Sequence, residues 1–411
     1  MRIKSIDARE ILNSRGWPAV EARVETESGV WAVASAPSGA STGAHEAHEL
    51  LDGGPRLRGR GMTRAAEHVR GEIARALTGM DVTDQQALDA RMGDLDGTSN
   101  LSRLGANATL AVSLACARAG AQVKGMELYE YLAAPAEMRT PLPMMNVING
   151  GAHAGNNVDI QEFMLVPVSA RGARESVFMC AEVYHALRSL LIEKGLSVAV
   201  GDEGGFAPDV EDDERALELM EDAVLHAGLV PGRDMAFALD VAASAWLTED
   251  GDYLLPKRRA RMSRESLMGF ICGIVDRHPI ISVEDPLHED DFGGFTEIRR
   301  RLGGVQVVGD DLFVTNRDRV LQGARMGSAT ALLVKPNQAG TLTRALDAAR
   351  AAREAGMELV VSHRSGETNS HDIVDIAVAL GAGYLKAGAP ARGERVAKYN
   401  RLMEIEARLS K

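Results

Sequence analysis

Three carboxylate side chains follow short apolar runs in the second half of the sequence, each at the point where a strand would end. Asp240 ends MAFALD, Glu284 ends PIISVE and Asp310 ends VQVVGD. Magnesium prefers oxygen ligands and takes few protein carboxylates beside water and substrate oxygens. If the three run ends converge, they predict a site for a hard divalent cation.

Three further features could serve chemistry beside such an ion. Lys335 ends the next run, TALLVK, and could act as a base if nearby cations lower its pKa. GDEGGF at 201–206 offers Glu203 beside two glycines that permit a substrate to approach closely. SGASTG at 38–43 is either an ordinary glycine-rich turn or a mobile lid that supplies a hydroxyl ligand.

The strands and helices that would position these residues can be predicted from the sequence, because apolar runs alternate with amphipathic stretches such as ERALELMEDAVLHAG. This alternation indicates parallel strands joined by crossover helices, in a barrel or a doubly wound sheet. The runs ELVVSH and GYLK also end in ionisable residues, His363 and Lys386. A barrel gathers all strand ends around one mouth, so the repeated polar ends favour the barrel over charges that merely mark the exit to solvent.

The first part of the chain has another pattern. IKSIDAREIL and PAVEARVETESGVWAVASA predict strands, helical patterns begin near Thr63, and GANATLAVSLACARAGAQ predicts a buried helix. A proline cluster at Pro135, Pro141 and Pro143 then interrupts the chain. We therefore expect a boundary near residue 134, between a domain of residues 1–134 and one of residues 135–411.

Composition restricts the class of function. The 411 residues carry a net charge of −12, which argues against nucleic acid as a partner, because phosphate backbones are bound mainly by Lys and Arg. Three separated cysteines suggest reduced thiols rather than disulfides. We also expect no membrane association and a cytoplasmic location, since the N-terminus lacks the apolar run of a secretory signal.

Eight segments resemble the signature segments of enolase, in enolase's order. They are NGGAHAGNNVDIQEFM, VGDEGGFAP, LDVAAS, SVEDPLHEDD, VGDDLFVTN, LLVKPNQAGTLT, VSHRSGET and LKAGAPARGERVAKYN. With SRG and PSGASTGAHEA near the start, the resemblance covers nearly the whole chain. It implies an α/β protein: an N-terminal α+β domain followed by a TIM-like barrel of the enolase type, with irregular first units.

The resemblance also implies an activity, the reversible dehydration of 2-phosphoglycerate to phosphoenolpyruvate by a homodimer or larger homo-oligomer. Lys335 would remove the C2 proton, Glu203 would protonate the departing C3 hydroxyl, and Lys386 would assist at the substrate carboxylate. Two magnesium ions are implied, the second arriving with substrate. The first ion would be held by Asp240, Glu284 and Asp310, of which the last two would also lie against the substrate, and the second by Ser41.

The remaining cavity residues are implied in the same way. Arg364 and Ser365 would bind phosphate, and the cavity would be lined by His153, Gln161, Glu162 and His363. His153 could instead be an ordinary loop histidine. The acid role requires a pKa for Glu203 well above the usual value of about 4.3. Strand alternation predicts that Asp285 and Asp311, which follow two of the proposed ligands, point away from the pocket.

Several positions depart from the enolase pattern and leave alternatives open. They are Trp17, Ala245, His288, Asn369, Ala387 and Gly393. A specialised paralogue, such as a carboxyphosphonoenolpyruvate synthase, would use 2-phosphoglycerate with a second anionic co-substrate. The basic stretch at 256–264 could attract that anion or could be solvated surface. A surface-binding role through Lys411 is an alternative of another class.

Overall fold

The N-terminal part of the chain is a small sheet with helices packed against it. The computed structural model describes residues 1–39, 43–133 and 138–410, and the expected boundary at 134 lies outside them. Strands β1 (Ile3–Leu12), β2 (Pro18–Thr26) and β3 (Trp31–Ala36) pair antiparallel in that order. They are followed by α1 (Thr63–His68), α2 (Ala74–Leu77), α3 (Gln85–Asp96), α4 (Ala106–Lys124) and α5 (Leu128–Leu132). The α+β arrangement expected from the sequence is confirmed.

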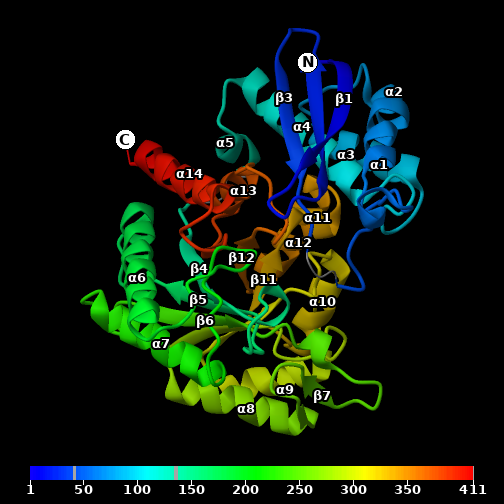
Figure 1. Ribbon diagram of the computed structural model, residues 1–411. Helices are drawn as coiled ribbons and strands as arrows, with labels where there is room; N and C mark the ends of the chain where they lie inside the picture. The colour runs from blue at the N-terminus through cyan, green and yellow to red at the C-terminus, as the bar shows by residue number, and fades with distance from the viewer. Residues whose placement is uncertain (40–42, 134–137, 411) are drawn as a thin grey trace.

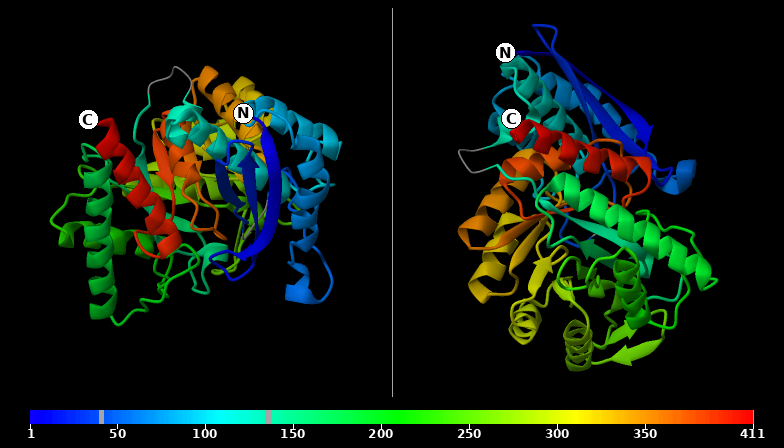
Figure 2. Two further views of the ribbon diagram at one scale, coloured as in Figure 1. Left: turned by 90° about the horizontal axis from the view of Figure 1, so that it is seen from above. Right: turned by 90° about the vertical axis from the view of Figure 1, so that its left-hand side faces the viewer.

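Helix α4 is the predicted buried helix, and it links the two parts of the molecule. Its small side chains allow it to pack against β2 and β3 over most of its length, and Ala108, Ala111 and Ala115 are fully buried. At its other face, Thr109 donates a hydrogen bond to the carbonyl of Gly340, at 2.8 Å. The sheet and its helices therefore sit directly over the second half of the chain, as Figures 1 and 2 show.

That second half is a closed barrel. In the described residues its strands follow the order β10 (Gln306–Gly309), β11 (Ala331–Val334), β12 (Glu358–Ser362), β13 (Tyr384–Lys386), β4 (Leu142–Asn149), β5 (Glu162–Val166), β6 (Ala236–Asp240) and β9 (Ile280–Glu284). Strand β5 runs antiparallel to β4 and β6, whereas the other neighbours are parallel. The preference for a barrel over a doubly wound sheet is confirmed, as are the irregular first units.

Helices surround the barrel, and a small hairpin extends from it (Figure 1). The longer helices are α6 (Ala173–Glu193), α7 (Asp213–His226), α8 (Arg264–Arg277), α9 (Phe292–Leu302), α10 (Arg317–Met326), α12 (Leu342–Glu354), α13 (Asp372–Leu380) and α14 (Gly393–Leu409), and α11 (Pro336–Ala339) is a single turn. The hairpin consists of β7 (Tyr253–Leu255) and β8 (Ala260–Met262). Among the described residues, no helix combines the length and the apolar composition that a membrane span requires.

The barrel interior is filled by an apolar layer that includes Ala238, Val308, Leu333 and Val360. Side chains two residues apart on a strand point to the same face. The residue two positions after Ala238 is Asp240, and the residues two positions after Val308 and Leu333 are Asp310 and Lys335. The alternation that packs the barrel therefore places these ionisable groups above the apolar layer, at one mouth of the barrel.

Candidate active site

One cavity at this mouth brings together most of the residues predicted from the sequence. Among the described residues it is lined by Gly39, Glu46, His153, Gln161, Glu162, Glu203, Asp240, Ala242, Asp285, Asp310, Asp311, Lys335, Ser362, His363, Arg364, Ser365 and Lys386. Glu284 is buried and contacts Lys386. Ser41 and Lys411 lie outside the described residues.

Strand register explains the first group of carboxylates. Glu162 lies opposite Asp240 across the β5–β6 pair, and Asp240 lies opposite Glu284 across the β6–β9 pair. Because β5 is antiparallel, its first residue reaches the same mouth as the last residues of its neighbours. The ammonium of Lys386 lies between them, 2.9 Å from Asp240 Oδ2, 2.8 Å from Glu284 Oε2 and 3.3 Å from Glu162 Oε1.

Burial makes these charges strongly interdependent. Burial, together with neighbouring carboxylates, raises the pKa of Glu162 and of Glu284 well above the usual value. Burial lowers the pKa of Lys386, but the surrounding carboxylates outweigh it and the pKa rises well above the ordinary value. Gln161 adds a weaker contact, with Nε2 donating to Asp240 Oδ2 at 3.3 Å.

A second group surrounds Lys335. Its ammonium pairs with Asp310 Oδ2, and Gln338 donates to Asp310 Oδ1 at 2.8 Å. Burial lowers the pKa of Lys335, but the charge of Asp310 outweighs burial and raises the pKa above its usual value. Among the protein groups alone, the condition that nearby cations lower this pKa is therefore not met. Cations do lie nearby, at Arg364 and Lys386, but a carboxylate is in direct contact.

Asp285 and Asp311 line the cavity, so the expectation that they point away is wrong. The backbone of Asp285 adopts a left-handed conformation with φ of 42°, which ends the regular alternation of β9. Its carboxylate accepts hydrogen bonds from the backbone amides of Asp310 at 3.0 Å and Asp311 at 2.7 Å. Burial and the charge of Asp310 raise the pKa of Asp311 to about 8.

The donor set fits a divalent cation. Oxygen atoms of Asp285, Asp310 and Asp311 lie within 4.8 Å of one another. Glu284 Oε1 and Glu162 Oε2 are buried without a hydrogen-bond partner among the described residues. A buried carboxylate oxygen without a partner is costly, so these atoms favour an added cation. The acidic groups at this mouth could therefore bind a metal ion.

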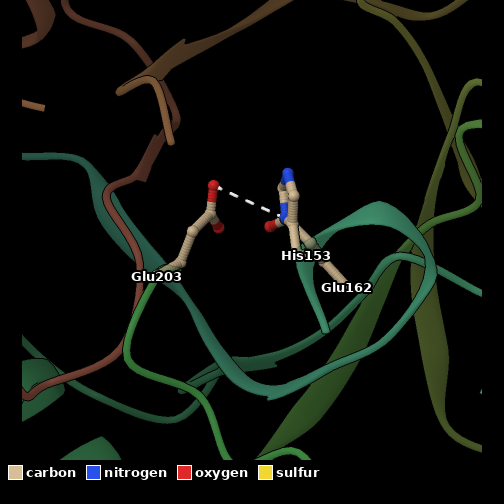
Figure 3. Close-up of side chains that lie close together, drawn as sticks. All are labelled: His153, Glu162 and Glu203. Carbon is tan, nitrogen blue, oxygen red and sulfur yellow. Dashed lines mark ion pairs between the residues drawn. The ribbon is translucent and has the colours of Figure 1, made fainter. Parts of the chain in front are cut away.

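Glu203 lies on another wall of the cavity, among imidazoles. Its Oε1 is 3.7 Å from His153 Nδ1, and its Oε2 is 3.4 Å from His363 Nε2. Figure 3 shows the carboxylate of Glu203 directed toward the ring of His153. Glu162 Oε1 also lies 3.7 Å from His153 Nδ1. Asn146 on β4 donates to Glu203 Oε2 at 3.1 Å. His153 is thus a cavity residue rather than an ordinary loop histidine.

The pKa of Glu203 is shifted in the direction opposite to the expectation. Burial raises it, but the imidazoles of His363 and His153 outweigh burial and hold this pKa well below the usual value. The sequence did not reveal that two histidines separated by about 200 residues in the chain meet at this carboxylate. Burial also lowers the pKa of His363, to about 4.

Arg395, on α14, fixes the orientation of His363 and was not identified from the sequence. Its guanidinium is fully buried and contacts His363 Nδ1 at 2.6 Å. It also donates to the carbonyls of Arg364 at 2.7 Å and Ser365 at 2.8 Å. Because a guanidinium is only a donor, Nδ1 accepts and Nε2 carries the proton that faces Glu203. The signal in the sequence was an arginine in the first turn of the helix that begins in GERVAKYN.

Glu46 is a second residue that sequence reasoning missed. It pairs with Arg364 at 2.9 Å, and it also accepts a hydrogen bond from the backbone amide of Gly43 at 3.0 Å. Arg364 and Ser365 lie side by side on the cavity wall, after β12. The segment after SGASTG thus reaches the arginine that was expected to bind phosphate.

Comparison with protein families agrees with this geometry. Residues 3–132 match the model described as "Enolase, N-terminal domain", and residues 137–411 match "Enolase, C-terminal TIM barrel domain". The two matches together account for nearly the whole chain, and the barrel they describe is the one that carries the cavity. The chain therefore belongs to the enolase family, and it is an enolase-type lyase.

Proposed function

We propose that the protein catalyses the reversible dehydration of 2-phosphoglycerate to phosphoenolpyruvate. The observation that carries this proposal is the arrangement of one cavity: an ammonium group, Lys335, and a carboxylate, Glu203, both line it, together with Arg364, Ser365 and Lys386. Dehydration next to a carboxylate needs a base, an acid and positive charge between them, and the cavity supplies these three elements.

Lys335 and Glu203 have separate tasks in this reaction. Lys335 takes the C2 proton onto Nζ, and the electron pair of the broken C–H bond moves onto the substrate carboxylate, which gives an enediolate. That electron pair returns to form the C2–C3 double bond when the C3–O bond breaks. Glu203 gives a proton to the C3 hydroxyl, which leaves as water. Lys386 faces the substrate carboxylate, on which negative charge develops, and Arg364 and Ser365 bind the phosphate. The cavity is completed by His153, Gln161, Glu162 and His363.

The metal sites are part of the proposal. Asp240, Glu284 and Asp310 would hold one magnesium ion, and Ser41 would contribute to a second that arrives with the substrate. Bound ions supply positive charge at the substrate carboxylate, where a proton next to an already ionised group is otherwise very weakly acidic. A lysine base beside magnesium is characteristic of the enolase superfamily, and membership of the enolase family is what supports this pairing.

A second anionic co-substrate, as in the specialised paralogue, has less support. That alternative needs the basic stretch at 256–264 to offer its charges to a ligand. In the structure Arg258 pairs with Asp159 and Asp213, and Arg261 pairs with Asp250 and Asp252. Charges already paired within the protein attract a further anion weakly.

The direct test is turnover of 2-phosphoglycerate by the purified chain, followed as formation of phosphoenolpyruvate. Product should form with magnesium and stop when a chelator removes the metal, and adding magnesium back should restore it. A chain that forms no phosphoenolpyruvate and exchanges no C2 proton with solvent would contradict the proposal. A chain that exchanges the C2 proton but forms product only with a second anionic substrate would favour the paralogue.

A further inference from the structure

The β7–β8 hairpin carries two arginines with different surroundings. Arg258, in the turn, has Nε 3.0 Å from Asp159 Oδ2, and its second terminal nitrogen pairs with Asp213 Oδ2. Its guanidinium also lies over the ring of Phe270, 4.9 Å from the centroid. Arg261, by contrast, pairs with solvent-accessible carboxylates of its own hairpin region, Asp250 and Asp252.

The two carboxylates that bind Arg258 are themselves buried, and each also accepts hydrogen bonds from backbone amides. Asp213 is fully buried, and its Oδ1 accepts hydrogen bonds from the amides of Asp159 at 3.0 Å and Ile160 at 2.9 Å. Asp159 is 1% exposed, and its Oδ1 accepts from the amide of Lys257 at 2.7 Å. Arg258 therefore ties together the hairpin, the start of α7 and the segment before β5. Removing the arginine would leave two buried charges without their cation.

That segment, residues 150–161, carries part of the active site. It contains His153 and Gln161 and leads into Glu162. Its base is closed by hydrogen bonds from Gly150 to the carbonyl of Gln161 and from Gly151 to that of Val158, both at 2.9 Å. Beyond this base, the hairpin also holds the residue after His153, because Lys257 Nζ donates to the carbonyl of Ala154 at 3.2 Å. The hairpin is thus the support against which this segment rests.

We propose that Arg258 is a positioning residue for the reaction: it holds segment 150–161 so that the His153 ring stays against Glu203. The inference rests on the proposed function, because it assigns Arg258 an effect on the same reaction. Arginine suits the role, since its planar fork reaches two carboxylates at once, whereas the single ammonium of lysine does not present that geometry.

The first test compares Arg258→Gln with the matched control Arg261→Gln, which removes the same charge from the same hairpin. Arg258→Gln should lower kcat by up to about 10²-fold, the cost of misplacing a catalytic group by about 1 Å, with a smaller change in KM. Arg261→Gln should stay close to the unchanged protein. Arg258→Lys should remain impaired. Equal kinetics of Arg258→Gln and Arg261→Gln would overturn the proposal.

A double-mutant cycle separates positioning from a general loss of structure. If Arg258 acts through His153, the variant with both Arg258→Gln and His153→Gln should be no slower than His153→Gln alone. If the two losses multiply, Arg258 does not act through His153 and the assignment is wrong. Should Arg258→Gln fail to fold, Asp213→Asn replaces it in the cycle, because its amide oxygen still accepts from both backbone amides while the charge that binds Arg258 is gone.

Hydrogen–deuterium exchange of peptides covering residues 150–161 gives a readout that does not depend on the substrate. Exchange in this segment should increase in Arg258→Gln and not in Arg261→Gln, while exchange in α4 should stay unchanged in both. If the unsubstituted chain does not turn over 2-phosphoglycerate and the segment still loosens, the proposed function fails and the anchoring role stands. If the chain is active and the segment stays protected in Arg258→Gln, the inference fails and the function stands.

Discussion

The Lys335 wall and the Glu203 wall of the cavity hold charge in different ways. Lys335 is in direct contact with a carboxylate, Asp310, so its pKa is raised and it carries a proton at neutral pH. Glu203 lies among two imidazoles and an amide, which hold its pKa low, so it is ionised. In the structure, the proposed base, Lys335, is therefore protonated, and the proposed acid, Glu203, is ionised.

Hydration and dehydration need different protonation states of Lys335 and Glu203. Adding water to phosphoenolpyruvate needs a protonated Lys335 and an ionised Glu203, the state that the structure favours. Dehydration starts from the opposite arrangement, in which Glu203 is protonated and Lys335 is neutral. The two arrangements contain equal numbers of protons, so their ratio does not depend on pH, and substrate and metal charges must shift it.

The largest effect should come from removing the Lys335 ammonium. Lys335→Ala should lower turnover of 2-phosphoglycerate by about 10³-fold or more, within the range for a positioned base, because no other amine contacts Asp310 among the described residues. Steady-state rates measure this. Lys194→Ala, at an exposed lysine 4.0 Å from Asp222, is the control and should be unaffected. A loss of less than tenfold would assign the base elsewhere.

A smaller effect, on stability, should come from His363. Its pKa is about 4 in the folded protein, against 6.5 when unperturbed, because burial disfavours the charged ring. The unfolded chain therefore binds a proton that the folded one does not, and stability present above pH 6.5 is lost as pH falls toward 4. The contribution of this residue should fall by about 2 kcal/mol between pH 7.5 and pH 5.

Urea unfolding of the unsubstituted chain and of His363→Gln at both pH values isolates this contribution. The variant should lose less stability on acidification, whatever its stability at pH 7.5. His226→Gln, at an exposed position at the end of α7, should keep the full pH dependence. Parallel losses in the unsubstituted chain and His363→Gln would show that the ring is not held neutral.

The smallest effect concerns the pH profile of the rate. The two arrangements of Lys335 and Glu203 differ only in which group holds the proton. Titration of this pair should therefore change kcat/KM with saturating magnesium by less than about threefold between pH 7 and 9. Initial rates in buffers of constant ionic strength measure this. A tenfold rise per pH unit would mean that the active form has lost the proton, and the two walls would not be linked as described.

The sequence predicted the parts of this site that lie at strand ends. Asp240, Asp310 and Lys335 each end an apolar run, and the expectation that a barrel gathers its strand ends placed them at one mouth. Resemblance to enolase supplied the roles and the irregular first units of the barrel, and the family matches agree with it. Among those units, the antiparallel β5 puts Glu162 in register with Asp240.

Contacts between distant segments could not be predicted in this way. Asp285 lines the cavity because its backbone turns left-handed, which periodicity does not encode. The pKa directions of Lys335 and Glu203 depend on which neighbour is in contact, Asp310 in one case and two histidines in the other. Arg258 looked like surface charge in the basic stretch, and only its buried partners show otherwise.

The most direct test of the division between the two walls is solvent exchange at C2 in Glu203→Gln. With 2-phosphoglycerate and magnesium in heavy water, proton NMR follows loss of the C2 proton and formation of phosphoenolpyruvate in the same sample. Glu203→Gln should still exchange the C2 proton while dehydration falls by about 10²-fold or more, and Lys335→Ala should lose both. If Glu203→Gln loses exchange and dehydration equally, the base and the acid are not separate groups and the account is wrong.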